Sequence, residues 1–326
     1  METKKLDSYD QLDNDWHRIL KINSTNTIFL TQWWQKTWYK HFIGQRTPLL
    51  LVVKKQTETV GIAPLMLEGK TIRFMGGTDL FDYQDFLIIP GYEKEVYFSI
   101  IEFLDSIEWD NIVLESVVEN SPILNELPKV VKSFGYNYKS VQEDVTPGSI
   151  LQNSWDQYIA LLSKKHRHEI RRKLKRLSST HEIKHMNFDS TDNLKQGMAM
   201  FVDLHKKSSP QKSEFMTEQR AAFFAEIVEE ASQKSHLRLR FTFIEDKPVS
   251  STLGFNYNDS FLLYNSGYDP EYSNLSVGIE STVNAIKVAI DEGLEYFDFL
   301  RGPERYKYQL GGKDKFIYQI SIDKSD

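Results

Sequence analysis

Apolar and polar positions alternate along the chain in two successive runs that predict the same order of elements. In the first half, aromatic and apolar residues recur at helical spacing over residues 29–42, and this pattern predicts a helix. Apolar segments separated by polar turns then predict an antiparallel meander. The predicted strands are 48–53, 59–67, 71–75, 86–89 and 111–115, and further helices are predicted at 95–107 and 122–134.

The second half repeats this order with different residues. Predicted helices cover 155–177, 194–207 and 217–232, strands follow at 237–244, 249–257 and 261–266, and a helix at 277–292 precedes strands at 296–299 and 316–322. The polar, turn-rich stretch 143–149 is the predicted seam. We therefore expect an α/β (α+β) chain of two tandem domains, 1–147 and 148–326, each a mixed, mostly antiparallel sheet flanked by helices.

The composition allows two cores and excludes cysteine chemistry. The chain has 326 residues, of which 40% are hydrophobic, enough for a core in each domain. It contains no cysteine, so disulfides, thiolate nucleophiles and thiolate-bound metals are excluded, and any thioester belongs to a substrate. The start of the chain is charged, and no apolar run reaches membrane-spanning length. These features predict a soluble cytoplasmic protein without a transmembrane segment.

One segment is strongly basic, although the net charge of −6 argues against DNA or other nucleic acid binding by the surface as a whole. Residues 164–176 contain eight Lys or Arg and a single acid, Glu169. They continue a helical apolar stripe, so one face is core and the rest is cationic. A solvated charged face is one interpretation. The other is that Arg167 and Arg171, one helical turn apart, bind a phosphate or another anionic group. Membrane binding is a third, but the stripe lacks the usual Trp and Phe anchors.

The H-E-x-x-H pattern of zinc sites occurs from His181 to His185. On a helix the two His residues would share a face, but the residues that follow favour a strand. Positions four apart in a strand are about 13 Å from each other, too far to share one ion. We therefore predict no metal site.

The richest polar stretch surrounds the start of the helix at 277–292. A strand end, the turn Ser276-Val277-Gly278 and a helix N-terminus follow one another, an order that leaves backbone N–H groups directed into a cleft. This geometry suits an anion such as a pyrophosphate. The alternative is a plain helix start capped by Ser276, in which Gly278 is merely tolerated.

Several ordered motifs resemble the CelD-type acetyltransferases of the GNAT superfamily. In the second half they are Gly-Tyr-Asp-Pro (267–270), Leu-Ser-Val-Gly (275–278), the segment 297–307 and the basic helix 162–172. In the first half they are a Trp-rich helix, Ala-Pro-Leu (63–65) and Asp-Tyr-Gln-Asp (82–85). The resemblance spans about residues 28–320 and implies two GNAT-like domains, of which the first is a degenerate copy without the Ser-x-Gly turn. The FemABX-like transferases are wider relatives, and the segment 306–311 is similar to their aromatic-Lys motif.

The resemblance implies an N-acyltransferase that moves an acyl group, in the first instance acetyl, from acyl-CoA to an amine. Acyl-CoA is then a co-substrate, and no cofactor is tightly bound. The implied acceptors are small amines such as amino sugars or nucleotide-linked sugars of surface polysaccharide. One alternative is a FemABX-like transferase that uses aminoacyl-tRNA on a cell-wall precursor, with tRNA as its partner. Another is a catalytically inactive GNAT-fold scaffold that binds sugar nucleotides or polysaccharide.

Two sequence features bear on the donor. No long helical hairpin is inserted in the second half, which favours acyl-CoA over tRNA. In contrast, the turn at 276–278 departs from the Arg/Gln-x-x-Gly-x-Gly/Ala loop of ordinary GNAT enzymes.

Acyl transfer to an amine needs positioning, an oxyanion contact and modest proton transfer. Backbone N–H groups near residues 265–268 are the predicted oxyanion contact. Asp298 and Glu304 are the candidate bases, because aromatic surroundings raise the pKa of a carboxyl, although Asp298 could equally be a structural cap. Tyr268 and Tyr306 are candidate acids, or packing residues that only line the cleft, and the resemblance implies that Lys307 faces the acceptor or stabilises charge. The remaining candidates are Asn265, Ser276, Val277, Gly278 and Ile279 at the donor, and Arg167, Arg171, Asp82, Tyr83 and Asp85 at the acceptor.

Overall fold

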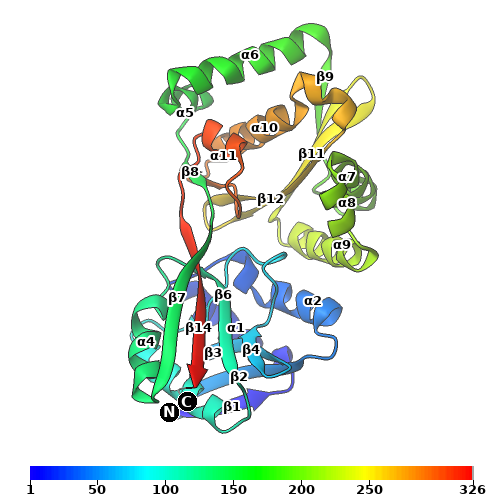
Figure 1. Cartoon of the computed structure of the whole chain (residues 1–326). Coiled ribbons are helices and arrows are strands. Elements are labelled where there is room, and N and C mark those ends of the chain that lie inside the picture. The colour runs from blue at the N-terminus through cyan, green and yellow to red at the C-terminus, as the bar shows by residue number, and fades with distance from the viewer. Residues whose placement is uncertain (325–326) are drawn as a thin grey trace. The chain divides into compact units, whose positions relative to one another are not determined.

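The computed structural model describes residues 1–324, which form two compact units (Figure 1). The first consists of Met1–Val145 together with the segment that begins at Lys315, and the second is Thr146–Asp314. The predicted division into 1–147 and 148–326 differs from these units at the end of the chain. There, β14 (Phe316–Lys324) pairs antiparallel with two strands of the first unit, because its buried isoleucines complete that unit's core.

The first unit is built on one eight-stranded sheet. Its strands follow the order β1-β2-β3-β4-β6-β14-β7, with β5 paired to β3, and only β4 and β6 pair in parallel. The elements are β1 (Glu2–Leu6), η1 (a 3-10 helix, Tyr9–Leu12), α1 (Asp13–Ile22), η2 (Ile28–Leu30), α2 (Gln32–Phe42), β2 (Thr47–Lys55), β3 (Glu58–Glu68), β4 (Thr71–Phe74), β5 (Leu87–Ile88), α3 (Glu93–Asp105), β6 (Asn111–Val118), α4 (Ile123–Ser133), β7 (Tyr136–Val145) and β14.

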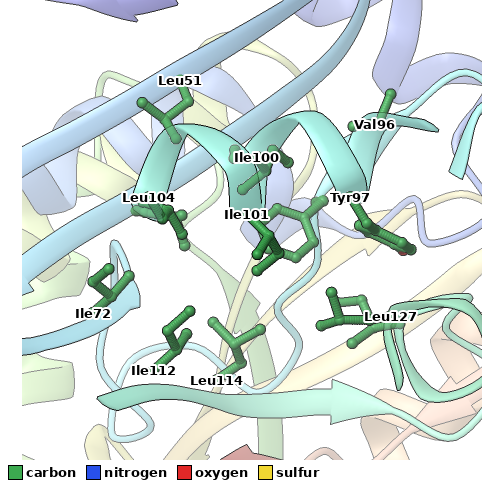
Figure 2. Packing of buried hydrophobic residues seen from close by; sticks show 14 of the residues in the cluster. Leu51, Ile72, Val96, Tyr97, Ile100, Ile101, Leu104, Ile112, Leu114 and Leu127 are labelled. Carbon is green, nitrogen blue, oxygen red and sulfur yellow. The ribbon is translucent and has the colours of Figure 1, made fainter. Parts of the chain in front are cut away.

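Helix α3 supplies the centre of this unit's core (Figure 2). Its buried side chains recur at the spacing of one helical face, and they are Val96, Tyr97, Ile100, Ile101 and Leu104. Figure 2 shows them packed over Leu51 of β2, Ile72 of β4, and Ile112 and Leu114 of β6. Full burial of one such side chain contributes about 1.5–3 kcal/mol, so this face fixes the helix on the sheet.

The second unit is built on a six-stranded sheet of order β8-β13-β12-β11-β10-β9. All its strand pairs are antiparallel except β12 with β13. The elements are β8 (Gly148–Ile150), α5 (Trp155–Leu161), α6 (Lys164–Thr180), β9 (Ile183–Asn187), α7 (Leu194–Ser208), α8 (Pro210–Phe215), α9 (Glu218–Gln233), β10 (Leu237–Ile244), β11 (Lys247–Tyr257), β12 (Ser260–Tyr268), η3 (Pro270–Leu275), α10 (Val277–Asp291), β13 (Tyr296–Asp298) and α11 (Arg305–Gln309).

The two units repeat the same local topology. In each, three antiparallel strands lead into a helix, and the strand after that helix pairs in parallel with the third strand of the meander. These strands are β2, β3, β4 and β6 in the first unit and β10, β11, β12 and β13 in the second. The predicted fold class, two tandem mixed sheets flanked by helices, is therefore confirmed.

Several local features differ from the predicted elements; β1, α1 and β8, for example, were not predicted. The predicted helix 155–177 is divided into α5 and α6, because Leu162 adopts an extended conformation and the Ser163 side chain accepts a hydrogen bond from the His166 N–H as a new N-cap. Helix α8 lies in the predicted gap after α7. Strand β7 continues to Val145, inside the stretch predicted as a turn-rich seam. No helix within residues 1–324 is both long and apolar enough to cross a membrane.

Candidate active site

Strands β12 and β13 pair over only three residues and then part. The parallel pairing runs from Ser260 with Tyr296 to Leu262 with Asp298, whereas β12 continues to Tyr268. After Asp298 the chain turns away through two residues with left-handed backbone, Leu300 (φ 57°) and Gly302 (φ 108°). The distal half of β12 stays paired with β11 on one side, and on the side of β13 it faces an opening.

A pocket of about 440 Å³ lies at this opening. Its walls come from the end of β12, the start of α10, helix α8 and the segment after β13. The lining residues are Lys212, Ser266, Tyr268, Ser273, Ser276, Val277, Gly278, Ile279, Thr282, Glu304 and Tyr306. The structure thus brings seven of the predicted site residues to one cavity, while their chemical roles stay predictions.

The head of α10 forms one wall of the pocket and lacks a side-chain cap. Ser276 is left-handed (φ 60°), and its hydroxyl makes no capping hydrogen bond to the helix. The interpretation of Ser276 as a plain cap is therefore wrong, and the first N–H groups of α10 have no capping side chain. The Nη2 atom of Arg176 donates to the Ser276 hydroxyl at 3.3 Å, while the buried Nε of Arg176 has no hydrogen-bond partner among the described residues. A guanidinium and a helix N-terminus thus meet at one point, which favours an anion.

Lys307 is hydrogen-bonded to the backbone of the loop between β13 and α11. Its ammonium is buried and donates hydrogen bonds to the carbonyl oxygens of Leu300, Arg301 and Gly302 at 2.9, 2.6 and 3.0 Å. It also lies 2.9 Å from the Oε2 atom of Glu304. Protein atoms therefore engage this ammonium, whereas the resemblance implied a group that faces the acceptor.

The two candidate bases occupy different places. Asp298 is buried, and its Oδ1 atom accepts the Leu300 N–H at 2.8 Å, as a carboxylate that caps the turn would do. Glu304 lines the pocket, and its side chain is 56% exposed. Of the two carboxylates, only Glu304 is among the residues around the pocket.

The two tyrosines predicted as acids, Tyr268 and Tyr306, both line the pocket. Burial, helped by the nearby carboxylate of Glu304, raises the pKa of Tyr306 above its ordinary value. The Tyr306 hydroxyl therefore stays protonated near neutral pH and acts as a hydrogen-bond donor more readily than as a proton donor.

The predicted oxyanion contact on β12 is already occupied. The Ser266 N–H donates to the side-chain oxygen of Asn265 at 3.0 Å, and the Tyr268 N–H donates to the Ser208 hydroxyl at 2.7 Å. Asn265 itself is not among the residues that line the pocket. Helix α7 thus provides at Ser208 the partner that a neighbouring strand would otherwise supply.

Two groups at this corner were missed from the sequence, Lys212 and His205. The Lys212 ammonium lines the pocket and donates to the Ser266 carbonyl oxygen. Burial lowers the pKa of Lys212 to about 8, although Glu304 acts in the opposite direction. Burial, followed by the charge of Lys212, lowers the pKa of His205 to about 4, so His205 is neutral. In the sequence, Ser209 followed by Pro210 is a typical helix start and could have predicted α8. No sequence feature indicated that Lys212 would line the pocket.

The predicted anion-binding arginines lie on the outer face of α6. Arg167 is half-buried and donates to the Ala160 carbonyl oxygen at the end of α5, and Arg171 is exposed. Neither lines the pocket at α10. A second, open groove of about 880 Å³ lies beside them, lined by Lys164, Lys165, His166, His168, Glu169, Lys173, Arg305 and Gln309.

The three acceptor residues predicted from the first half, Asp82, Tyr83 and Asp85, belong to the first unit. Asp85 is buried and accepts hydrogen bonds from the Thr25 hydroxyl and, at 2.8 Å, from the Phe86 N–H. Burial raises its pKa to about 6. Tyr83 is buried with its ring edge-on to Phe29. Asp85 and Tyr83 thus each have a local structural role.

The H-E-x-x-H segment has a structural role in the sheet of the second unit. His181 ends α6, and His185 lies in β9, where its Nε2 atom is 2.8 Å from the Oε1 atom of Glu280 on α10. The other oxygen of Glu280 accepts a hydrogen bond from the Thr242 hydroxyl. From Ile183 onward the segment is a strand, as predicted. No group of three metal-binding side chains occurs within residues 1–324.

Comparisons with known proteins agree with this fold. Residues 164–308 match a protein-family model described as an acetyltransferase (GNAT) domain. No curated protein matches the chain. Among solved structures, the chain is similar to FemX (11% identity, TM-score 0.66, 98% of this chain and 97% of that chain), to a tandem GNAT protein from the clavulanic acid biosynthesis pathway (11%, 0.56, 100% and 99%) and to a GNAT-family acetyltransferase from Colwellia psychrerythraea (9%, 0.54, 99% and 100%).

At these identities, likeness to solved structures establishes the fold alone. The chain has two GNAT-like domains in a FemABX-like fold, as the resemblance implied. The family match and the fold support an acyltransferase, and they leave the donor and the acceptor open.

Proposed function

We propose, from the tandem GNAT fold and the acetyltransferase (GNAT) match over residues 164–308, that this chain is an N-acyltransferase that moves an acetyl group from acetyl-CoA to an amine. The observation that carries the proposal is the pocket where β12 and β13 part, at the uncapped head of α10. Acyl-CoA needs both features, an anion site for its phosphates and a pocket for its thioester arm.

The head of α10 is the proposed site for the donor's pyrophosphate. Its first N–H groups lack a capping side chain, and Arg176 brings a guanidinium to Ser276. By contrast, the corresponding helix of the first unit, α3, begins with Glu93 and Glu95, and the Glu93 carboxylate accepts the Gly91 N–H at 2.8 Å. The two carboxylates in the first turn of α3 repel a phosphate, whereas the acid in the first turn of α10, Glu280, is buried and bonded to His185 and Thr242, so we propose only one donor site in the chain.

Positioning supplies most of the proposed catalysis. The amine attacks the acyl carbon directly, because the chain has no cysteine to form a thioester of its own. Glu304 faces the pocket and can accept a hydrogen bond from the acceptor's amine, and the Tyr268 and Tyr306 hydroxyls can donate hydrogen bonds to the carbonyl or the departing sulfur. Asp298 and Lys307 act one step away, through the turn that carries Glu304.

The proposed acceptor is an amine linked to an anionic group, such as an amino sugar or a nucleotide-linked sugar. The cationic face of α6, with Arg167, Arg171 and the groove beside them, supports an acceptor that carries phosphate or carboxylate.

Calorimetric titration of the whole chain with acetyl-CoA, CoA and dephospho-CoA tests the donor. We expect saturable binding of acetyl-CoA and of CoA and stabilisation of the fold in a thermal melt, because a ligand that binds the native state raises its stability. Release of the CoA thiol in the presence of an amine panel then tests transfer. Binding without thiol release under any amine would favour an inactive scaffold.

A FemABX-like, aminoacyl-tRNA-dependent transferase is the second candidate, and helix α6 is the observation that favours it. Four of its cations, Lys164, Lys165, Arg171 and Lys175, have no carboxylate at ion-pair distance among the described residues. Unpaired cations along one helix are what an RNA backbone requires. Stabilisation by charged tRNA that weakens steeply with salt, with no effect of any CoA ester, would replace the acetyl-CoA proposal by this one.

A further inference from the structure

We propose that Lys212 is the proton carrier of this site, taking the proton from the acceptor amine and delivering it to the departing thiol. The inference rests on the proposed acyl transfer and adds to it a residue that neither the resemblance nor the family match indicated. Three features of the structure support this role: the position of Lys212 in the pocket, the groups around its ammonium, and the contacts that fix its helix to β12.

The position of Lys212 is fixed by contact of two helices with the open half of β12. Gly267 lies against the backbone of α7, where a Cβ atom would be only 2.5 Å from the His205 nitrogen. Ser208, at the end of α7, accepts the Tyr268 N–H at 2.7 Å. Helix α8 follows immediately, and its Lys212 reaches the Ser266 carbonyl oxygen. The ammonium is thus held beside the pocket wall, near the residues that line the proposed path of the thioester.

The groups that face Lys212 come from every element packed around it. His205 on α7 is neutral, because its pKa is lowered to about 4. Tyr268 on β12 and Tyr306 on α11 line the same pocket, as does Glu304, whose negative charge raises the pKa of Lys212. Glu304 is therefore the one anionic group that acts on this ammonium among the described residues, and it is mostly exposed.

The chemistry of this environment suits proton exchange near neutral pH. An ordinary lysine has a pKa of about 10.4 and is a poor base because it is almost always protonated. Burial lowers the pKa of Lys212 to about 8, so a substantial fraction is neutral at pH 7–8. A base is most effective when its pKa lies near the working pH.

The proposed step moves one proton from the acceptor amine to the departing sulfur by way of Lys212. The nitrogen of the neutral acceptor amine forms a bond to the acyl carbon, and the neutral Nζ atom of Lys212 removes a proton from that nitrogen. The C–S bond of the thioester breaks, and its electron pair leaves on sulfur. Protonated Lys212 then gives the proton to the thiolate. The products are an amide and a free thiol, and Lys212 returns to its neutral form.

The test measures thiol release from acetyl-CoA against pH, with glucosamine as the probe amine at a constant concentration of its neutral form and with no amine as a second series. In the wild-type chain we expect the rate to rise with pH through a midpoint near 8, because the neutral form of Lys212 is the active base. Lys212→Arg keeps a positive donor for the Ser266 carbonyl but cannot lose its proton at these pH values. It should lose the rise and lower the rate at pH 8 by about 10²- to 10⁴-fold.

Two further variants separate proton transfer from structure. Lys212→Gln keeps a neutral hydrogen-bond donor for the Ser266 carbonyl oxygen, and should bind acetyl-CoA like the wild type while losing the pH-dependent rate. Glu304→Gln removes the negative charge that raises the pKa of Lys212, so the midpoint of the profile should move to lower pH. Lys206→Met, on the exposed face of α7, is the matched lysine control and should leave the profile unchanged.

Chemical rescue gives a signature that a structural role would not produce. Because the chain has no cysteine, Lys212→Cys creates a single thiol that 2-bromoethylamine converts to an aminoethyl side chain of nearly lysine length. The alkylated variant should regain the pH-dependent rate, with its midpoint below that of the wild type, since the thioether lowers the pKa of the amine. Alkylation of the wild-type chain under the same conditions is the control.

The outcomes distinguish this inference from the proposed function. If the wild-type chain binds acetyl-CoA and releases thiol, and Lys212→Arg and Lys212→Gln retain the same pH profile, the proton-carrier role is wrong while the acyltransfer proposal stands. If the wild-type chain neither binds acetyl-CoA nor releases thiol from it, the proposed function fails first, and Lys212 loses its assigned role with it.

Discussion

The Lys307 ammonium lies 2.9 Å from the Oε2 atom of Glu304 and, at the same time, beneath three consecutive backbone carbonyls of the loop that carries Glu304. Two residues of that loop, Leu300 and Gly302, have left-handed backbone. One buried cation thus collects carbonyl oxygens that would otherwise be buried without donors. The conformation that points Glu304 toward the pocket depends on it.

Lys307→Met should therefore destabilise the chain and abolish acyl transfer together. Loss of the ammonium leaves the carbonyl oxygens of the loop without their donor, and we expect the free energy of unfolding to fall by about 3 kcal/mol in urea titration. Lys313→Met, which removes an exposed lysine a few residues later, is the control. If Lys307→Met unfolded like the wild type and lost only transfer, Lys307 would act on the acceptor directly, as the family resemblance implied.

A substitution at Gly278 separates phosphate binding from folding. A Cβ atom at this position would be 3.6 Å from the Tyr268 ring, an ordinary contact, so Gly278→Asp and Gly278→Asn both fit. A carboxylate in the first turn favours the helix but repels a pyrophosphate at its head. We expect Gly278→Asp to weaken acetyl-CoA binding in calorimetry at least about tenfold relative to Gly278→Asn, with no loss of thermal stability. Equal affinities of the two variants would place the phosphates elsewhere.

The sequence predicted the part of the site that follows from local order. A strand end, a Ser-x-Gly turn and a helix start lie consecutively in the chain, and the β-α-β crossover brings the segment after β13 back beside them. For this reason local order alone is enough to assign Ser276, Gly278 and Glu304 to one cavity.

The other features of the site and the fold depend on contacts between residues that are far apart in the sequence. Lys212 reaches the pocket only because α7 approaches Gly267, a contact between segments about sixty residues apart. The position of β14 in the sequence places it in the second domain, but its partners are β6 and β7, and alternating apolar residues do not identify partner strands. A lysine such as Lys307, which follows aromatic and charged residues, resembles a surface group until its three carbonyl partners are known.

The buried carboxyl of Asp85 should make the stability of the chain depend on pH. Burial raises its pKa to about 6, above the value of about 3.9 in an unfolded chain, so the native state holds this proton more tightly. The free energy of unfolding should therefore fall as pH rises from about 4 to 6 and stay lower above that. Asp85→Asn removes the ionisable group and keeps an acceptor for the Phe86 N–H.

Urea titrations at pH 4 and pH 7 test this expectation. Relative to the wild type, Asp85→Asn should gain about 2–3 kcal/mol between the two pH values, because only the wild type must ionise a buried carboxyl. Asp246→Asn, which changes a fully exposed carboxylate, is the control. The same difference between wild type and Asp85→Asn at both pH values would show that Asp85 titrates normally.

Gly267→Ala tests whether the contact between α7 and β12 builds the pocket wall. The added Cβ atom would lie 2.5 Å from the His205 nitrogen and 2.7 Å from the Leu204 carbonyl carbon, and backbone atoms in a helix cannot move aside as a flexible side chain can. We expect the free energy of unfolding to fall by about 3 kcal/mol, with Gly278→Ala, whose Cβ atom has room, as the matched control.

Because Lys212 follows α7 in the chain, the Gly267→Ala substitution should also move the Lys212 ammonium away from the Ser266 carbonyl oxygen and return the pKa of Lys212 toward its ordinary value. Competitive labelling with acetic anhydride at several pH values, read by mass spectrometry of the Lys212 peptide, should then give a midpoint above the value near 8 expected for the wild type. An unchanged stability and an unchanged midpoint would mean that α7 does not position Lys212.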